Sequence, residues 1–261
     1  MGTSKTFHDA FLAENPLCCF CGGQAKATTI DHVPPRALFR GRKWPEGYIF
    51  PACHDCNNAT RRDELLVGML ARIFPDAEAP EHKAELHKHM AAVNAKFPGL
   101  LASMRIPRAQ ERRLLRERTA PSGKPPSGLL SITDPRFEQA IHQFGTKLML
   151  ALFYRHTQVI IPRSGGIPFR WFSNAQNLDE MLPRDTLAPL LGGFADLKRE
   201  STSLKDQFFY RYAIADTKNA AAFLAFFNQA IVMLGFVFPD ISKVKVPENA
   251  TVLVPYRRGS Q

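Results

Sequence analysis

The N-terminal fold is decided by two short stretches, "CCFCGGQAKATTIDHVPPR" at residues 18–36 and "PACHDCNN" at residues 51–58. They hold all five cysteines of the chain, and four of these form two Cys-x-x-Cys pairs: Cys18 with Cys21, and Cys53 with Cys56. Each pair can present two thiolates to one tetrahedral ion, and four soft sulfur ligands favour a structural Zn²⁺ with no open position. We therefore expect one zinc ion bound by the two pairs.

The fifth cysteine, Cys19, is interpreted as a small packing residue, because Cys19-x-Cys21 is poor spacing for metal ligands. The alternative is that all five cysteines are ordinary core residues. Paired spacing in four of the five argues against it. The segment between the pairs, residues 22–52, is longer than the roughly 15–20 residues of a plain zinc ribbon, so it holds an insertion.

The insertion contains Asp31 and His32 at the end of "ATTIDHV", a β-branched run that predicts a strand. A Pro-Pro pair follows and fixes the backbone behind it. Asn57 directly follows the last cysteine, at the start of a predicted helix. Zinc would hold this helix start near the strand end, so a carboxylate, an imidazole and an amide oxygen could converge there.

This pattern of CxxC, then DHVPPR, then PACxxCN resembles the HNH (ββα-metal) endonucleases, and among them the four-cysteine type. The resemblance covers roughly residues 15–75. It implies that Asp31 and Asn57 bind a catalytic divalent cation, Mg²⁺ or Mn²⁺. It also implies that His32 is the general base.

The residue types suit phosphodiester hydrolysis, which needs an activated water, charge stabilisation on the phosphate and help for the leaving oxygen. A neutral imidazole can take a proton from water near neutral pH. One hard cation held by Asp and Asn oxygens can act as a Lewis acid. The expected function is therefore a one-metal endonuclease acting on nucleic acid, in the first place DNA.

The chain departs from the family in the stretch "WPEGYIFPAC", residues 44–53, which lacks the Asn that often orients the base histidine. A backbone carbonyl is left to orient His32, or activity is low. Glu64 lies two helical turns after Asn57 and is interpreted as a surface acid, with a supporting metal ligand as the alternative. For His54, inside the second pair, loop packing or exposure is favoured over a role at the metal site.

The net charge of +10 and pI of 9.6 favour an anionic partner, nucleic acid first and an anionic membrane surface second. The residues that we expect to contact phosphate are Arg36, Arg61, Arg62, Arg112, Arg113 and Arg116. The last three belong to a basic stretch over residues 101–125 that could follow a nucleic-acid backbone without base specificity. For Arg61, Arg62 and the basic stretch, the alternative is a solvated helix face.

Periodicity predicts helices near residues 3–14, 57–74, 81–96, 99–118 and 135–156, and a Pro/Gly/Ser-rich linker at 118–128. Strands are predicted for four stretches: "TQVIIP", "FFYRYAIA", "AIVMLGFVF" and "ATVLVP". The apolar run at 220–238 is predicted to be a helix followed by a strand. The expected fold class is α+β: an N-terminal zinc-stabilised ββα-metal (HNH) module with flanking helices, then a small α+β domain. The expected divisions are residues 1–75, 76–128 and 129–261.

The sequence contains no membrane span and no secretory signal, so we expect a cytoplasmic protein with reduced thiols. The competing hypothesis is a non-catalytic zinc-ribbon nucleic-acid binder that keeps the ββα scaffold. A zinc-stabilised protein-interaction module would leave the positive charge unexplained. The sequence of the C-terminal part contains no recognisable catalytic motif. Its expected roles are substrate recognition, ligand sensing or formation of a homodimer.

Overall fold

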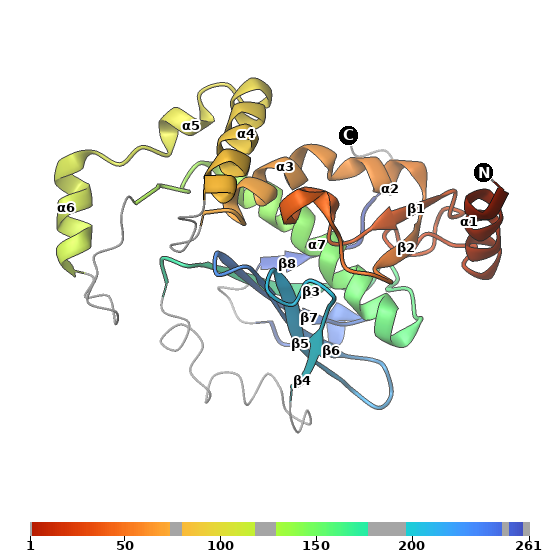
Figure 1. Ribbon diagram of the computed structural model, residues 1–261. Coiled ribbons are helices and arrows are strands. Elements are labelled where there is room, and N and C mark those ends of the chain that lie inside the picture. Colours follow the sequence, from red (N-terminus) through yellow and green to blue (C-terminus); the bar gives the residue numbers. More distant parts are fainter. Residues whose placement is uncertain (1, 74–79, 118–128, 177–196, 247–250, 258–261) are drawn as a thin grey trace.

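The computed structural model describes residues 2–73, 80–117, 129–176, 197–246 and 251–257 (Figure 1). Helices and strands are mixed along the chain, as expected for an α+β protein. Figure 1 shows one long helix, α7 (Pro135–Thr157), between the N-terminal elements and a six-stranded sheet. No helix among the described residues is long and apolar enough to cross a membrane.

A short antiparallel hairpin lies between the two cysteine pairs. β1 (Thr29–His32) pairs with β2 (Ile49–Ala52), in a register that places Asp31 opposite Phe50. The connection carries two 3₁₀ turns, η1 (Arg36–Leu38) and η2 (Arg40–Arg42). The predicted helix near the N-terminus is confirmed as α1 (Gly2–Glu14).

After β2 the chain passes at once into α2 (His54–Ala59) and then into α3 (Arg61–Leu70). The predicted order of strand, loop, strand and helix is confirmed. The helix expected after Asn57 is interrupted, because Thr60, which separates α2 from α3, caps α2 with a backbone φ of −100° and ψ of −1°. This break matters for the site below, since Thr60 is itself fully buried.

The next helices form an arm that leaves the body of the molecule, with α6 at its far end (Figure 1). The expected helix at 81–96 is confirmed as α4 (Pro80–Lys96). The single helix expected at 99–118 is wrong: it is divided into α5 (Leu100–Ser103) and α6 (Arg108–Glu117). Pro107 lies in the break, where it has no N–H to donate and restricts the residue before it.

The C-terminal sheet has the strand order β4-β5-β6-β7-β3-β8, and every neighbouring pair is antiparallel. A 3₁₀ turn, η3 (Ile241–Lys243), follows β7. The strand bounds are β3 (Ile167–Ser173), β4 (Lys198–Ser201), β5 (Phe208–Ile214), β6 (Ala221–Phe227), β7 (Ile231–Val237) and β8 (Thr251–Leu253). Three predicted strands are confirmed as β5, β7 and β8.

Two other expectations for this part are wrong. The apolar run at 220–238 is the hairpin of β6 and β7, turning at Asn228 with a φ of 51°, rather than a helix and a strand. Both faces of these strands are largely covered, so their sequence is continuously apolar and lacks the alternation of a half-exposed strand. "TQVIIP" forms no strand, because Gln158 ends α7 in a left-handed conformation and Ile161 then buries in the core.

The core joins the two ends of the chain. One buried cluster includes Val33 and Phe50 of the hairpin region, Phe144 of α7 and Phe223 of β6. Helix α7 begins at an Asp134 cap whose carboxylate accepts from the Arg136 N–H. Fourteen residues of α7 are buried, so the helix packs against neighbours on most sides.

Candidate functional site

The thiols of Cys18, Cys21, Cys53 and Cys56 lie together, with all four sulfur atoms within 4.8 Å of one another and all four residues buried. This confirms that the two pairs converge on one point. A Zn–S distance of 2.3 Å in a tetrahedron requires sulfur atoms about 3.8 Å apart, so the set fits a structural zinc ion with little adjustment. We call these four residues the cysteine cluster.

Local backbone structure explains the convergence. The first pair lies in a tight turn in which the Gly23 N–H donates to the Cys18 carbonyl at 3.2 Å, with Gly22 and Gly23 at positive φ. The second pair begins α2, where Cys53 precedes the first helical residue. The Cys19 N–H donates to the Pro51 carbonyl at 3.0 Å, which ties the first turn to β2 beside the second pair.

The sulfur atoms share hydrogen bonds that perturb one another. A hydrogen bond with Cys18, then one with Cys56, lowers the pKa of Cys21. The pKa of Cys56 is raised, first by Cys18 and then by Cys21. Four sulfurs this close cannot all be thiolates without a cation between them, which is what a bound metal ion supplies.

Two neighbours stand apart from the cysteine cluster. Cys19 is 1% exposed but is not one of the four grouped sulfurs, in keeping with a packing residue. His54 begins α2 with a side chain 79% exposed, and its ring lies 3.1 Å from the Asn58 amide. His54 therefore faces solvent.

Asp31 points from β1 toward α7, where its Oδ2 forms a 2.6 Å ion pair with Nζ of Lys147. The Lys147 side chain is fully buried, and that of Asp31 is 10% exposed. Burial acts to lower the pKa of Lys147, but the charges of Asp31 and then Glu64 more than offset it, so this pKa lies above its ordinary value. The carboxylate expected to hold a metal ion thus already holds an ammonium ion.

Three further oxygen groups meet the same ammonium. Thr60 Oγ1 lies 2.7 Å from Nζ, Glu64 Oε1 lies 3.2 Å away, and the backbone carbonyl of Asn57 lies 3.4 Å away. Thr60 also donates to Glu64 at 2.6 Å. We call Asp31, Asn57, Thr60 and Glu64, grouped around Lys147, the oxygen cluster.

The oxygen cluster corrects one expectation and qualifies another. Glu64, which was interpreted as a surface acid, has a side chain only 13% exposed and points inward. The Asn57 side chain donates from Nδ2 to Thr29 Oγ1 at 2.9 Å, which fixes the amide against β1. Asp31 and Asn57 therefore do lie beside one common atom, but that atom is a lysine nitrogen.

His32, the next residue on β1, contacts a different neighbour. Its ring meets Trp44 edge to face, with centroids 5.0 Å apart and planes at 87°. The guanidinium of Arg36 stacks on the same indole, 3.7 Å from the ring centroid. Burial, and secondarily the Arg36 charge, lowers the pKa of His32, which keeps the imidazole neutral near pH 7.

Trp44 packs edge to face against the His32 ring, and this contact restricts the orientation of the imidazole. It also holds Arg36 beside His32, so that a fixed positive charge lies next to the imidazole. Sequence reasoning missed Trp44, although it is the first residue of the stretch in which the Asn was sought.

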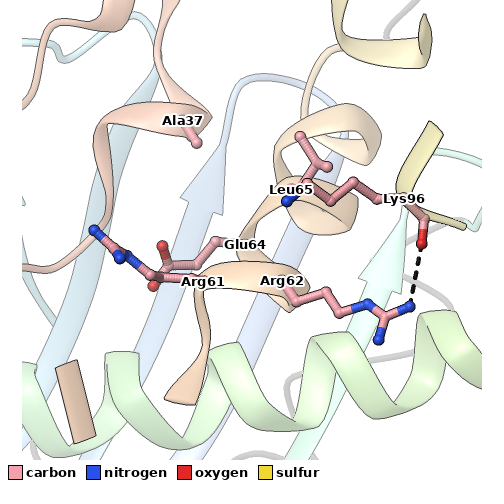
Figure 2. Close-up of a pocket in the computed structure, with 6 residues that line it drawn as sticks. All are labelled: Ala37, Arg61, Arg62, Glu64, Leu65 and Lys96. Atoms are coloured by element: carbon pink, nitrogen blue, oxygen red, sulfur yellow. Dashed lines mark hydrogen bonds between the residues drawn. The ribbon is translucent and has the colours of Figure 1, made fainter. Parts of the chain in front are cut away.

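Arg61 and Arg62 are exposed at the start of α3 and line a surface groove with Ala37, Glu64, Leu65 and Lys96. Figure 2 shows the two arginines pointing in different directions, with Arg62 donating to the Lys96 carbonyl. That hydrogen bond is 3.1 Å long, and the same guanidinium lies 4.7 Å above the Phe97 ring. Arg61 extends beside Glu64, which lines the same groove and belongs to the oxygen cluster (Figure 2).

The remaining predicted phosphate contacts lie on the arm. Arg112 and Arg113 are exposed on α6, far along the chain from the hairpin. Arg116 belongs to α6, but its side chain lies outside the described residues, as do Arg118 and Lys124 of the predicted basic stretch. The structure thus brings Arg36, Arg61 and Arg62 to the hairpin region and places Arg112 and Arg113 on the separate arm.

Comparison of the chain with family models, with curated proteins and with solved structures found no match. What the site can do must therefore be argued from its own residues.

The residue that sequence reasoning missed most completely is Lys147. A weak signal existed: Lys147 is a lone lysine one residue before Leu148 and three after Phe144, on a helix whose periodicity predicts burial at these positions. A lysine is almost never fully buried unless it is paired. The signal indicates a buried carboxylate partner without saying which one.

Proposed function

We propose that this protein is a zinc-stabilised endonuclease that hydrolyses phosphodiester bonds of nucleic acid, DNA in the first place, with His32 as its general base. One observation carries the proposal: on the hairpin between the two cysteine pairs, the half-buried His32 ring packs against Trp44 and the Arg36 guanidinium stacks on the same indole, which places an imidazole and a positive charge side by side. The resemblance of the sequence pattern to HNH endonucleases supports the same reading.

The chain's own residues supply the following chemistry. The neutral imidazole of His32 accepts a proton as a water oxygen attacks phosphorus. A new P–O bond forms, the P–O bond to the leaving oxygen breaks, and that oxygen takes a proton from solvent. Arg36, held on Trp44, contributes a positive charge beside the phosphate as negative charge develops on it.

The sequence pattern also predicted a catalytic Mg²⁺ or Mn²⁺ held by Asp31 and Asn57. The residues do not fit a dedicated cation site in this arrangement. Asp31 is paired with the fully buried Lys147 ammonium at 2.6 Å, and the Asn57 amide is engaged with Thr29. No step of the proposed reaction is therefore assigned to a divalent cation bound between these two side chains.

The test is a cleavage assay on duplex, single-stranded and branched DNA and on RNA, with the zinc-loaded chain and with added Mg²⁺ or Mn²⁺. His32→Ala should lower the rate by about 10²–10⁴-fold, because it removes the proton acceptor alone. His54→Ala is the matched control, since it removes an exposed imidazole from the neighbouring turn and should leave the rate unchanged. Equal loss in both variants would contradict the assignment of His32.

One observation favours a second candidate, the non-catalytic nucleic-acid binder. Asp31 forms an ion pair with the buried Lys147, so its Oδ2 is already engaged by a cation of the chain itself. A wild-type chain that retains DNA in a binding assay but cuts no substrate under any of these conditions would support the binder. Cleavage that depends on His32 would exclude it.

A further inference from the structure

The Lys147 ammonium is coordinated as a metal ion would be. Around Nζ lie a carboxylate at 2.6 Å, a hydroxyl at 2.7 Å, a second carboxylate at 3.2 Å and a backbone carbonyl at 3.4 Å. Carboxylate, hydroxyl and carbonyl oxygens are the ligands that hard divalent cations take in proteins. The lysine nitrogen carries three N–H donors and no acceptor, and these oxygens are the groups that surround it.

The buried position of Lys147 on α7 makes its positive charge costly to accommodate. Its neighbours Phe144 and Leu148 are fully buried, as is the lysine itself. Removing an ammonium ion from water is costly, and the cost is offset only when opposite charges and hydrogen bonds replace the lost water. Here the offset comes from Asp31 and Glu64 together, two carboxylates that would repel each other without a cation between them.

A divalent cation cannot share this place. A cation placed between Asp31 Oδ2 and Glu64 Oε1 would have to take the position of Nζ, which lies 2.6 Å from the first oxygen and 3.2 Å from the second. Two positive charges in one buried site repel strongly. Either the ammonium or the metal ion is present between Asp31 and Glu64, not both.

We propose that Lys147 is a built-in cation that takes the place of a divalent metal ion between Asp31 and Glu64. In this role Lys147 is a positioning residue: it touches no substrate, but it holds the hairpin, Thr60 at the α2–α3 break and α7 together. The oxygen cluster is thereby complete without an added ion. This inference takes its site from the proposed function, but it is tested by metal binding and stability, so it stands or falls separately from cleavage.

The first experiment uses the wild-type chain, zinc-loaded and freed of excess metal. Electron paramagnetic resonance of free Mn²⁺ during a titration should give the same binding for wild type and for Asp31→Asn, because the carboxylate is already occupied. Mn²⁺ binding by wild type that is lost in Asp31→Asn would overturn the proposal.

The second experiment removes the built-in cation. Lys147→Met keeps an unbranched side chain as far as the Cε position but lacks the ammonium, and it should lower the Tm by about 10 °C, because two buried carboxylates lose their partner. Mn²⁺ at 100-fold above its Kd should then raise the Tm of the variant by about 5 °C or more, and leave that of wild type unchanged.

The matched control is the double variant Lys147→Met with Asp31→Asn, in which one carboxylate is also neutral. Its Tm should not respond to Mn²⁺. A Lys147→Met variant that folds but shows no rise with Mn²⁺ would mean that Lys147 is an ordinary ion-pair partner, and would overturn the proposal. Should Lys147→Met not fold, the wild-type titration decides the matter by itself.

Discussion

The cysteine cluster and the oxygen cluster both draw residues from α2 and lie beside the same hairpin, yet they meet the same electrostatic problem in opposite ways. Each gathers groups that repel when ionised. The cysteine cluster consists of four sulfurs with no positive side chain among them, and its geometry fits a bound cation that would balance the charge of four thiolates. The oxygen cluster receives its cation from α7 through Lys147. The difference teaches that dependence on a metal ion can be set by a residue far from the ligands in sequence.

The largest effect should come from removing metal from the cysteine cluster. Chelation, or Cys53→Ser, should unfold the hairpin and α2, because the binding energy of a structural zinc ion is largely folding energy. Elemental analysis should give one zinc per chain for the wild type and none for Cys53→Ser, with loss of near-ultraviolet circular dichroism in the variant.

Cys19→Ser is the control for this prediction. It also replaces a buried cysteine of the first turn, but not one of the four grouped sulfurs. It should keep its zinc ion and lose only a small part of the stability. Loss of zinc in Cys19→Ser would break the comparison, because it would place a fifth residue in the metal site.

A smaller effect is expected when one charge is taken from the oxygen cluster. Glu64→Gln keeps the side chain's shape but removes its charge, and should lower the free energy of unfolding by about 2 kcal/mol, as for a lost hydrogen bond to a charged group. Urea denaturation with an unchanged m-value would measure it.

Asp55→Asn, on exposed α2 surface, is the matched control and should change the free energy of unfolding by less than about 0.5 kcal/mol. Equal changes in the two variants would mean that Lys147 does not depend on Glu64, and would reduce the oxygen cluster to the Asp31 pair. Added Mg²⁺ should restore neither variant, since the ammonium remains in place.

The smallest effect concerns Asp63, which lies beside the oxygen cluster without an ammonium of its own. Burial, and then the charge of Glu64, raises the pKa of Asp63 to about 6 from its usual 3.8. The folded chain therefore holds this proton more tightly than the unfolded chain does. The stabilisation that results is complete below pH 3.8 and is lost as the pH rises through about 6.

Asp63→Asn should consequently gain stability relative to wild type between pH 5 and pH 7.5. Urea midpoints of both proteins at the two pH values would measure the difference. A difference that stays constant with pH would show that the pKa of Asp63 is not raised in the folded chain.

The sequence predicted those parts of the molecule that local signals determine. The cysteine pairs, the strand around Asp31 and the start of α7 at Pro135 all follow from residue spacing or β-branched content in the local sequence. Pro107 is a local signal for the break between α5 and α6, but the prediction followed the helical periodicity and placed one helix across it.

Other features depend on contacts between distant segments, which a local pattern cannot supply. The run that forms β6 was read as a helix because its burial on both faces removes the alternation that marks a strand. Lys147 could be recognised as unusual, but its pairing with Asp31 and Glu64 arises only when α7 packs on the hairpin and α3. The division of the chain at 118–128 stays a prediction, with buried residues from both sides sharing one cluster.

The distance in sequence between Asp31 and Lys147 has a consequence for the order of assembly. As the chain leaves the ribosome N-terminus first, all four grouped cysteines are available once residue 56 has emerged, and they can then capture their metal. The carboxylates of Asp31 and Glu64 must wait until α7 has been made, because their cation is carried on it. Until α7 has emerged and packed on the hairpin and α3, Asp31 and Glu64 lack the cation that joins them in the folded chain.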